Sequence, residues 1–132
     1  MVKRKIAVAT EGKKGLEDLV SNVFGRAKTF TIVETAHEKI ISVSVLENPA
    51  LSYSHGAGPI AIKTLIDDGV ELVIANELGI GASEILEQHN IDYIKAKPGI
   101  NVEEIIKKKC CLHTKGSYLN YLRKNRLIGG LL

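Results

Sequence analysis

Residues 71–75 read Glu-Leu-Val-Ile-Ala, and this stretch indicates the class of fold. Four consecutive apolar residues without polar alternation are typical of a strand that is covered on both faces, as the strands of parallel sheets are. A helical pattern ends just before it, with an apolar stripe at Ile62, Leu65 and Ile66 and a terminating glycine at Gly69. We therefore expect a buried central strand that packs between helices in an α/β domain.

On both sides of this strand, strands and helices alternate along the chain. Further strands are expected over residues 5–9, 28–34, 39–46 and 91–95, and helices over residues 16–24, after Pro59, from Ala82 and from Val102. Residues 41–45 alternate between apolar side chains and serines, so the two segments 28–34 and 39–46 predict a hairpin with one half-exposed face. One strand of the sheet therefore runs antiparallel, and the remaining alternation predicts parallel neighbours.

The predicted helix over residues 16–24 depends on apolar spacing alone. Apolar residues recur at i, i+3, i+4, i+7 and i+8, the pattern of an amphipathic helix, at Leu16, Leu19, Val20, Val23 and Phe24. Gly25 follows as a candidate C-cap residue. Arg26 would then lie just after the helix end, where it either binds an anion or caps the carboxyl end of the helix.

Length and composition limit the class of protein. With 132 residues, 45% of them hydrophobic and 25% charged, the chain has the composition of one ordinary globular domain. Its apolar runs are too short to span a membrane or to form a signal peptide, so we expect a cytoplasmic protein without a membrane contact. The two cysteines are adjacent, which is no disulfide framework and fits a reducing compartment.

The formal net charge of +3 is unevenly distributed. Residues 1–14 carry a net charge of +4 and residues 107–132 a net charge of +7, whereas the segment between them carries −8. Such basic ends either bind an acidic partner, such as nucleic acid, or are solvated termini. Because no aromatic stacking platform accompanies the basic tail, we favour solvated termini and expect no nucleic-acid partner.

Two glycine-bearing turns precede helices, and they lie beyond the carboxyl ends of predicted strands, where ligands bind in such sheets. Residues 55–59 read HGAGP, and residues 78–82 read LGIGA. Paired glycines let backbone N–H groups converge on an anion at a helix N-terminus, and His55 would add a metal ligand or a hydrogen-bond donor. The alternative is that the glycines only permit tight turns. Neither turn is a complete P-loop or dinucleotide fingerprint.

Cys110 and Cys111 stand in the basic tail, followed by Leu112 and His113. They have no spaced Cys-x-x-Cys partner, so we do not expect a closed zinc site. The cysteines are either incidental or assist in holding a soft metal through their thiolates. We expect that neither is required for folding, because the preceding residues suffice for a core.

Two other functions stay open at this point. A small phosphoryl-transfer or nuclease enzyme needs carboxylates at strand ends to hold magnesium. The first predicted strand ends Ala9-Thr10-Glu11, with no acid inside it, and no nucleophile arrangement is recognisable in the sequence. The other alternative is an adaptor that binds nucleic acid or protein through the basic tail.

Several segments together resemble the dinitrogenase iron–molybdenum cofactor biosynthesis family, the NifX-like group. They are residues 6–9 (IAVA), 23–27 (VFGRA), 30–33 (FTIV), 55–58 (HGAG), 69–74 (GVELVI) and 78–82 (LGIGA). The resemblance implies a three-layer α/β/α ribonuclease H-like fold, with a five-stranded mixed sheet in the order 3-2-1-4-5 and strand 2 antiparallel. Residues 1–107 would form the cofactor-binding domain, and residues 108–132 a basic C-terminal tail outside the family pattern.

The resemblance also implies a function. Some members carry iron–sulfur or iron–molybdenum cofactor precursors between assembly proteins, and a related small protein binds a molybdenum–copper sulfide cluster. It therefore predicts a small non-catalytic carrier of an anionic iron–sulfur or molybdenum-containing cluster, with cluster-assembly proteins as partners. The expected cluster-binding residues are His55, Gly56, Gly58, Gly79, Gly81 and Arg26, with His55 as the metal ligand, Cys110 and Cys111 as weaker metal candidates, and Lys13 and Lys14 as added positive charge.

Overall fold

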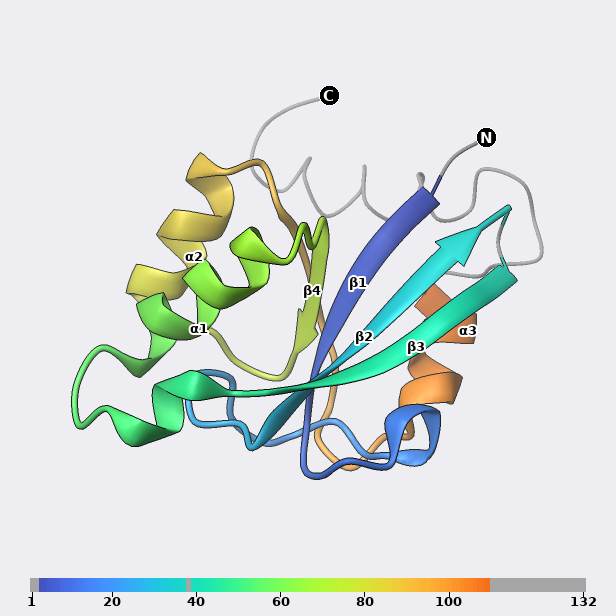
Figure 1. Cartoon of the computed structure of the whole chain (residues 1–132), viewed down its shortest axis with the longest axis horizontal. Helices are drawn as coiled ribbons and strands as arrows, with labels where there is room; N and C mark the ends of the chain where they lie inside the picture. The colour runs from blue at the N-terminus through green and yellow to red at the C-terminus, as the bar shows by residue number, and fades with distance from the viewer. Residues whose placement is uncertain (1–2, 38, 110–132) are drawn as a thin grey trace.

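The computed structural model describes residues 3–37 and 39–109, and these form one five-stranded sheet with helices on both faces (Figure 1). The strands are β1 (Lys3–Thr10), β2 (Thr29–Ala36), β3 (Lys39–Glu47), β4 (Leu72–Ala75) and β5 (Asp92–Lys95). The helices are α1 (Ala57–Asp67), α2 (Ile80–Gln88) and α3 (Val102–Lys109), and two short 3-10 turns are η1 (Gly15–Glu17) and η2 (Pro49–Ser52).

The sheet is mixed, with the strand order β3-β2-β1-β4-β5 that the family resemblance implied. Strand β2 runs antiparallel to both β1 and β3, whereas β4 runs parallel to β1 and β5. The predicted hairpin of β2 and β3 is therefore confirmed, with a β-bulge at the register shift between Glu34 and Thr35. Assignment of this α/β architecture to the ribonuclease H-like folds stays a prediction.

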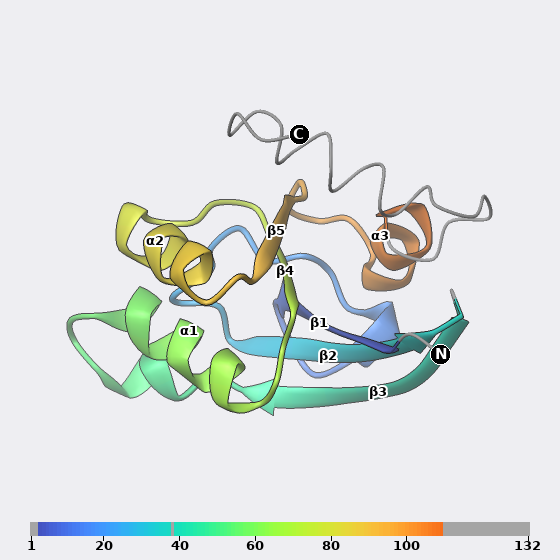
Figure 2. The same ribbon diagram turned by 90° about the horizontal axis from the view of Figure 1, so that it is seen from above.

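Two hydrophobic cores lie on opposite faces of the sheet. Helices α1 and α2 cover one face, and α3 covers the other, as Figure 2 shows from above. The two faces follow from strand alternation, because Ala7 and Ala9 belong to the first core and Ile6 and Val8 to the second. All four residues of β4 are fully buried, so the expectation of a central strand covered on both faces is confirmed.

The predicted helix over residues 16–24 is wrong. After the 3-10 turn η1 the chain forms no helix and makes single β-bridges at Leu19 and Val20. Val20 donates its N–H to Ile100 O at 2.8 Å, and Ser21 donates to Ala9 O at 2.8 Å. The apolar side chains point in different directions, because Val20 is buried in the core under α3 and Phe24 in the core under α1 and α2. One helical stripe cannot reach both faces of a sheet, so the long-range contacts override the local spacing.

Smaller differences concern element ends. Helix α1 begins at Ala57, two residues before Pro59. At the start of α3 the Asn101 Oδ1 atom accepts a hydrogen bond from the Glu104 N–H at 3.2 Å. Helix α3 runs to Lys109, so the predicted boundary at residue 107 falls inside it. The tail cysteines lie outside the described residues.

The described helices contain no segment that is long and apolar enough to cross a membrane.

Candidate functional site

A hollow of about 540 Å³ opens beyond the carboxyl ends of β1 and β4. These two parallel neighbours are the point where the chain order reverses, because β1 leads to β2 on one side and β4 leads to β5 on the other. Ligands bind at such switch points in open α/β sheets. The lining residues come from three segments: Asn22, Val23, Phe24, Gly25 and Arg26 after β1, Gly56, Ala57, Gly58 and Pro59 at α1, and Glu77, Leu78, Gly79, Gly81 and Ala82 at α2.

The N-terminus of α1 forms one wall of the hollow. Its N-cap residue Gly56 has φ 74°, a left-handed conformation that glycine adopts without strain, and no side chain caps the helix. The first backbone bond of the helix is Ile60 N–H to Gly56 O at 3.1 Å. The N–H groups of Ala57 and Gly58 therefore have no partner within the helix, and Pro59 has no N–H to satisfy.

The N-terminus of α2 forms the facing wall and has the same character. Gly79 is the N-cap residue, again without a side-chain cap, and the Ser83 N–H reaches Gly79 O at 3.0 Å. The helices lie side by side in Figure 2, and a Cβ at Gly58 would lie 3.7 Å from Ala82 Cβ. Two uncapped helix starts thus meet at one hollow, and each contributes free N–H groups and the positive end of its dipole.

A turn after β1 packs directly on the start of α1. In this turn the Ala27 N–H donates to Phe24 O at 3.1 Å. A Cβ at Gly25 would lie 2.9 Å from Gly58 N and 3.1 Å from Gly58 Cα, so only glycine permits this backbone approach. The sequence indicated a helix C-cap at Gly25; the actual reason for a glycine here is a contact between two walls of the hollow.

Asn48 holds this turn in place from the loop after β3. Its side chain is buried, and its Nδ2 donates to Gly25 O at 2.9 Å and to Ala27 O at 2.8 Å. Its Oδ1 accepts the N–H of Ala50 at 2.9 Å, which fixes the start of η2. One amide side chain therefore satisfies three backbone groups and joins the turn to the loop that leads into α1.

The lining contains two charged residues of opposite sign, Arg26 and Glu77. The Arg26 guanidinium is exposed and donates from Nη2 to Ser54 O at 3.1 Å. The turn that carries Glu77 is fixed at its start by Tyr93, whose hydroxyl lies 3.1 Å from Ala75 O and 3.0 Å from Asn76 O. The hollow thus presents one cation and one carboxylate beside the two helix starts.

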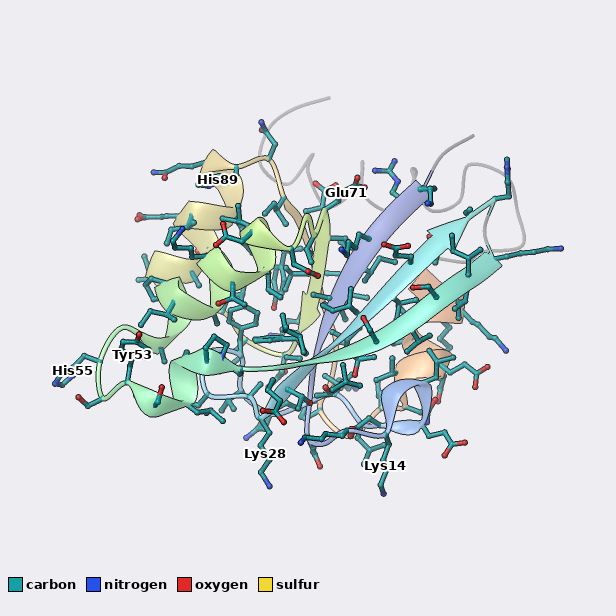
Figure 3. The ribbon with its side chains drawn as sticks, viewed as in Figure 1. Lys14, Lys28, Tyr53, His55, Glu71 and His89 are labelled. Atoms are coloured by element: carbon teal, nitrogen blue, oxygen red, sulfur yellow. The ribbon has the colours of Figure 1, made fainter. Side chains whose placement is uncertain are left out.

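The lysines expected to add positive charge do not line the hollow. Lys13 Nζ lies 2.5 Å from Glu47 Oε2, and this hydrogen bond and the lysine charge lower the pKa of the Glu47 carboxyl from its ordinary value. Lys14 points away from the molecule at its lower edge in Figure 3. The positive character of the hollow therefore comes from Arg26 and the backbone, because the two lysines are absent from its lining.

The structure brings five of the six predicted cluster-binding residues together in the lining, namely Arg26, Gly56, Gly58, Gly79 and Gly81. His55 is not among the lining residues, and its exposed side chain points outward from the loop before α1 (Figure 3). Cys110 and Cys111 lie outside the described residues. Within residues 3–37 and 39–109, no group of three or more His, Cys, Asp or Glu side chains could hold a metal ion.

Sequence reasoning missed Asn22, Gly25, Asn48 and Glu77. A signal existed only for Asn48, which precedes Pro49 in the long loop, since asparagine before a turn often bonds nearby backbone. Its longer-range partners, twenty-one and twenty-three residues earlier, carry no local signal. The other three acquire their places only through the packing of the segments after β1 and β4.

These features define a class: an α/β protein with a ligand hollow at the switch point of its sheet, suited to an anion. Within this class, the chain belongs to the dinitrogenase iron-molybdenum cofactor family, whose model matches residues 4–110. It is 32% identical over 84 residues to an uncharacterized protein of Methanocaldococcus jannaschii, covering 64% of this chain and 70% of that protein.

Two solved structures share the fold at appreciable sequence identity. The apo form of the orange protein from Desulfovibrio gigas has a TM-score of 0.71 and 30% identity, over 78% of this chain and 83% of that one. A putative NifB protein from Thermotoga has a TM-score of 0.64 and 33% identity, over 78% and 84% of the two chains. The description of the family model relates the chain to the dinitrogenase iron–molybdenum cofactor.

Proposed function

We propose that this protein is a non-catalytic carrier that holds an anionic metal–sulfur cluster, or a precursor of one, in the hollow between α1 and α2. The observation that carries the proposal is the meeting of two uncapped helix N-termini at one hollow of about 540 Å³ at the switch point of the sheet. Free N–H groups and helix dipoles attract an anion from two sides. Membership in the cofactor family supports a metal-containing cargo.

The chemistry of the lining suits reversible binding. The residues that line the hollow include no cysteine, histidine or methionine, so none of them offers a soft ligand to a metal. The cargo would be held through N–H groups, Arg26 and the apolar wall of Val23 and Leu78. Such contacts release an intact cluster more readily than thiolate ligation does. The role of His55 as a metal ligand stays a prediction.

The proposal includes a cellular setting. Residues 1–107 would form the cluster-binding domain and residues 108–132 a basic tail, in a cytoplasmic protein that receives the cluster from one assembly protein and passes it to another. A phosphoryl-transfer role has less support, because Glu77 is the single carboxylate residue among the described residues of the lining. Two-metal phosphoryl transfer needs several carboxylates around its ions.

Anaerobic titration of the metal-free protein with tetrathiomolybdate, a small molybdenum–sulfur dianion, tests the proposal. We expect saturable binding at one site. The visible absorption of the bound anion reports the binding. Gly58→Val should weaken binding at least tenfold, because its branched side chain crowds the start of α1 against Ala82. His55→Ala serves as the matched loop variant and reports whether His55 contributes. Equal binding by the parent and Gly58→Val would place the site elsewhere.

Gly81→Ala separates binding from stability. A Cβ at Gly81 meets no atom within 4 Å, and alanine is the better helix former, so we expect a gain of about 0.5 kcal/mol in the free energy of unfolding. The same methyl group narrows the hollow, so tetrathiomolybdate should bind several-fold more weakly. Ser83→Ala is the control, because Ser83 lies in the same helix but outside the lining. Its affinity for tetrathiomolybdate should equal that of the parent, whatever the change in its free energy of unfolding. A Gly81→Ala protein that binds as well as the parent would show that the start of α2 takes no part.

A further inference from the structure

Strand β3 forms one edge of the sheet, and within the described residues it pairs only with β2 (Figure 1). None of its nine residues is buried, and Ile41 and Val43 are 49% and 38% exposed. The N–H and C=O groups along its outer side therefore have no partner strand in the described part of the chain. Such an edge is a template for pairing with another strand.

The two edges of the sheet differ in how well they are protected. The opposite edge strand, β5, has only four residues, and two of them, Asp92 and Lys95, are charged. Short length and charge both discourage pairing at an edge. In the longer β3, residues 40–46 contain no charged residue, proline or glycine. The β-bulge leaves Ile41 unpaired with β2, but residues 42–47 continue the ladder without interruption.

The sequence of β3 is complementary to its own reverse. It reads KIISVSVLE, with Val43 at the centre, a lysine at one end and a glutamate at the other. In an antiparallel pair of two such strands centred on Val43, Lys39 faces Glu47 of the second copy at both ends, and Ser42 faces Ser44. Apolar side chains likewise face apolar ones. Because directly opposed side chains interact, this register brings opposite charges together and no like charges.

Both end charges are available to a second copy. Lys39 is exposed and forms no ion pair with another described residue. The Glu47 side chain is 72% exposed and contacts Lys13 through one oxygen, and a carboxylate accepts a second cation beside the first. The bulge displaces the Lys39 end by one residue, a distance that a long lysine side chain spans.

We propose that two copies of the chain form a two-fold symmetric dimer through β3, with the two strands antiparallel and centred on Val43. Such a contact uses the same surface on both copies and joins their sheets into one. Strands β1 and β3 both run antiparallel to β2, so they share one direction. The two hollows therefore lie at opposite ends of the joined sheet, and no β3 residue lines either. Dimerisation should leave tetrathiomolybdate binding unchanged, so the dimer and the proposed function can fail separately.

Two charge reversals test the dimer by sedimentation equilibrium at low ionic strength. Lys39→Glu places two carboxylates opposite each other at both ends of the joined strands, and Glu47→Lys places two ammonium groups there. Each variant alone should have a dimer dissociation constant at least tenfold higher than that of the parent. An equimolar mixture of the two variants restores an opposite-charge pair at both ends, so the mixed dimer should form with about the affinity of the parent.

Lys95→Glu and Glu87→Lys are the matched controls, because they make the same charge changes on β5 and at the far end of α2. Each should dimerise as the parent does, alone and mixed. A parent that stays monomeric up to about 1 mM would overturn the proposal, and is the result expected if residues 110–132 or another protein cover β3. A dimer that neither reversal weakens, or that the mixture does not restore, would overturn it as well.

Hydrogen exchange locates the contact without any substitution. In the parent, the backbone amides of β3 that point away from β2 should exchange more slowly as the protein concentration rises, whereas those of β5 should not change. Slower exchange at another surface, with none in β3, would place the contact between the copies elsewhere and overturn the proposal.

Discussion

Gly25→Ala is expected to destabilise the protein by about 1–3 kcal/mol, although it adds only one methyl group. The new Cβ would lie 2.9 Å from Gly58 N and 3.3 Å from Ala57 C, and these are backbone atoms that cannot rotate away. The turn after β1 must therefore separate from the start of α1. Thermal denaturation followed by circular dichroism should show a melting temperature lower by roughly 5–15 °C.

Gly81→Ala is the control for this experiment, because it adds the same methyl group to the same hollow where nothing lies within 4 Å. Its melting temperature should equal or exceed that of the parent. Tetrathiomolybdate affinity should fall in Gly25→Ala, since the displaced turn also carries Arg26. If Gly25→Ala had the same melting temperature as the parent, the close backbone contact between Gly25 and Gly58 would be contradicted.

Asn48→Asp is expected to lower the free energy of unfolding by about 2–4 kcal/mol at neutral pH. The side chain is 5% exposed, and its Nδ2 donates to two carbonyl oxygens, at Gly25 and Ala27. An aspartate has no donor there, so a buried carboxylate would face two acceptors at hydrogen-bond distance. Urea denaturation at pH 7 should show the loss as a lower midpoint with an unchanged slope.

The pH dependence of this variant has a definite sign. Burial beside two carbonyl oxygens raises the folded-state pKa of the new carboxyl above its unfolded value. Between those two pKa values the folded protein binds more protons than the unfolded chain, so its stability falls as pH rises through this window. The deficit relative to the parent should therefore shrink on acidification, because the protonated carboxyl donates one hydrogen bond.

Asn101→Asp makes the same chemical change at the start of α3, where the side-chain oxygen accepts the N–H of Glu104. An aspartate keeps this bond and favours a helix N-terminus, so stability should change by no more than about 0.5 kcal/mol. A similar loss in both variants would show that the effect of Asn48→Asp comes from net charge and not from its buried partners.

The five strands could be predicted from the sequence because they depend on local patterns. A continuous apolar run marks β4 as a strand covered on both faces. The alternation in β3 marked a strand, but the half-buried face that it predicted is wrong, because Ile41 and Val43 are exposed. The glycines at positions 56, 58, 79 and 81 could likewise be found, since glycine before a helix start is a local feature. These signals sufficed for the strands and for two walls of the candidate site, but the strand order of the sheet was implied only by the family resemblance.

The third wall was decided by the tertiary structure alone. The spacing of residues 16–24 is that of a helix, but Val20 and Phe24 are buried in cores on opposite faces of the sheet, and the chain between them is not helical. Gly25 meets Gly58, and Asn48 meets Gly25, only after segments more than twenty residues apart have packed. The spacing of apolar residues indicates which side chains are buried. It does not indicate what a buried side chain contacts, because those contacts depend on the packing of distant segments.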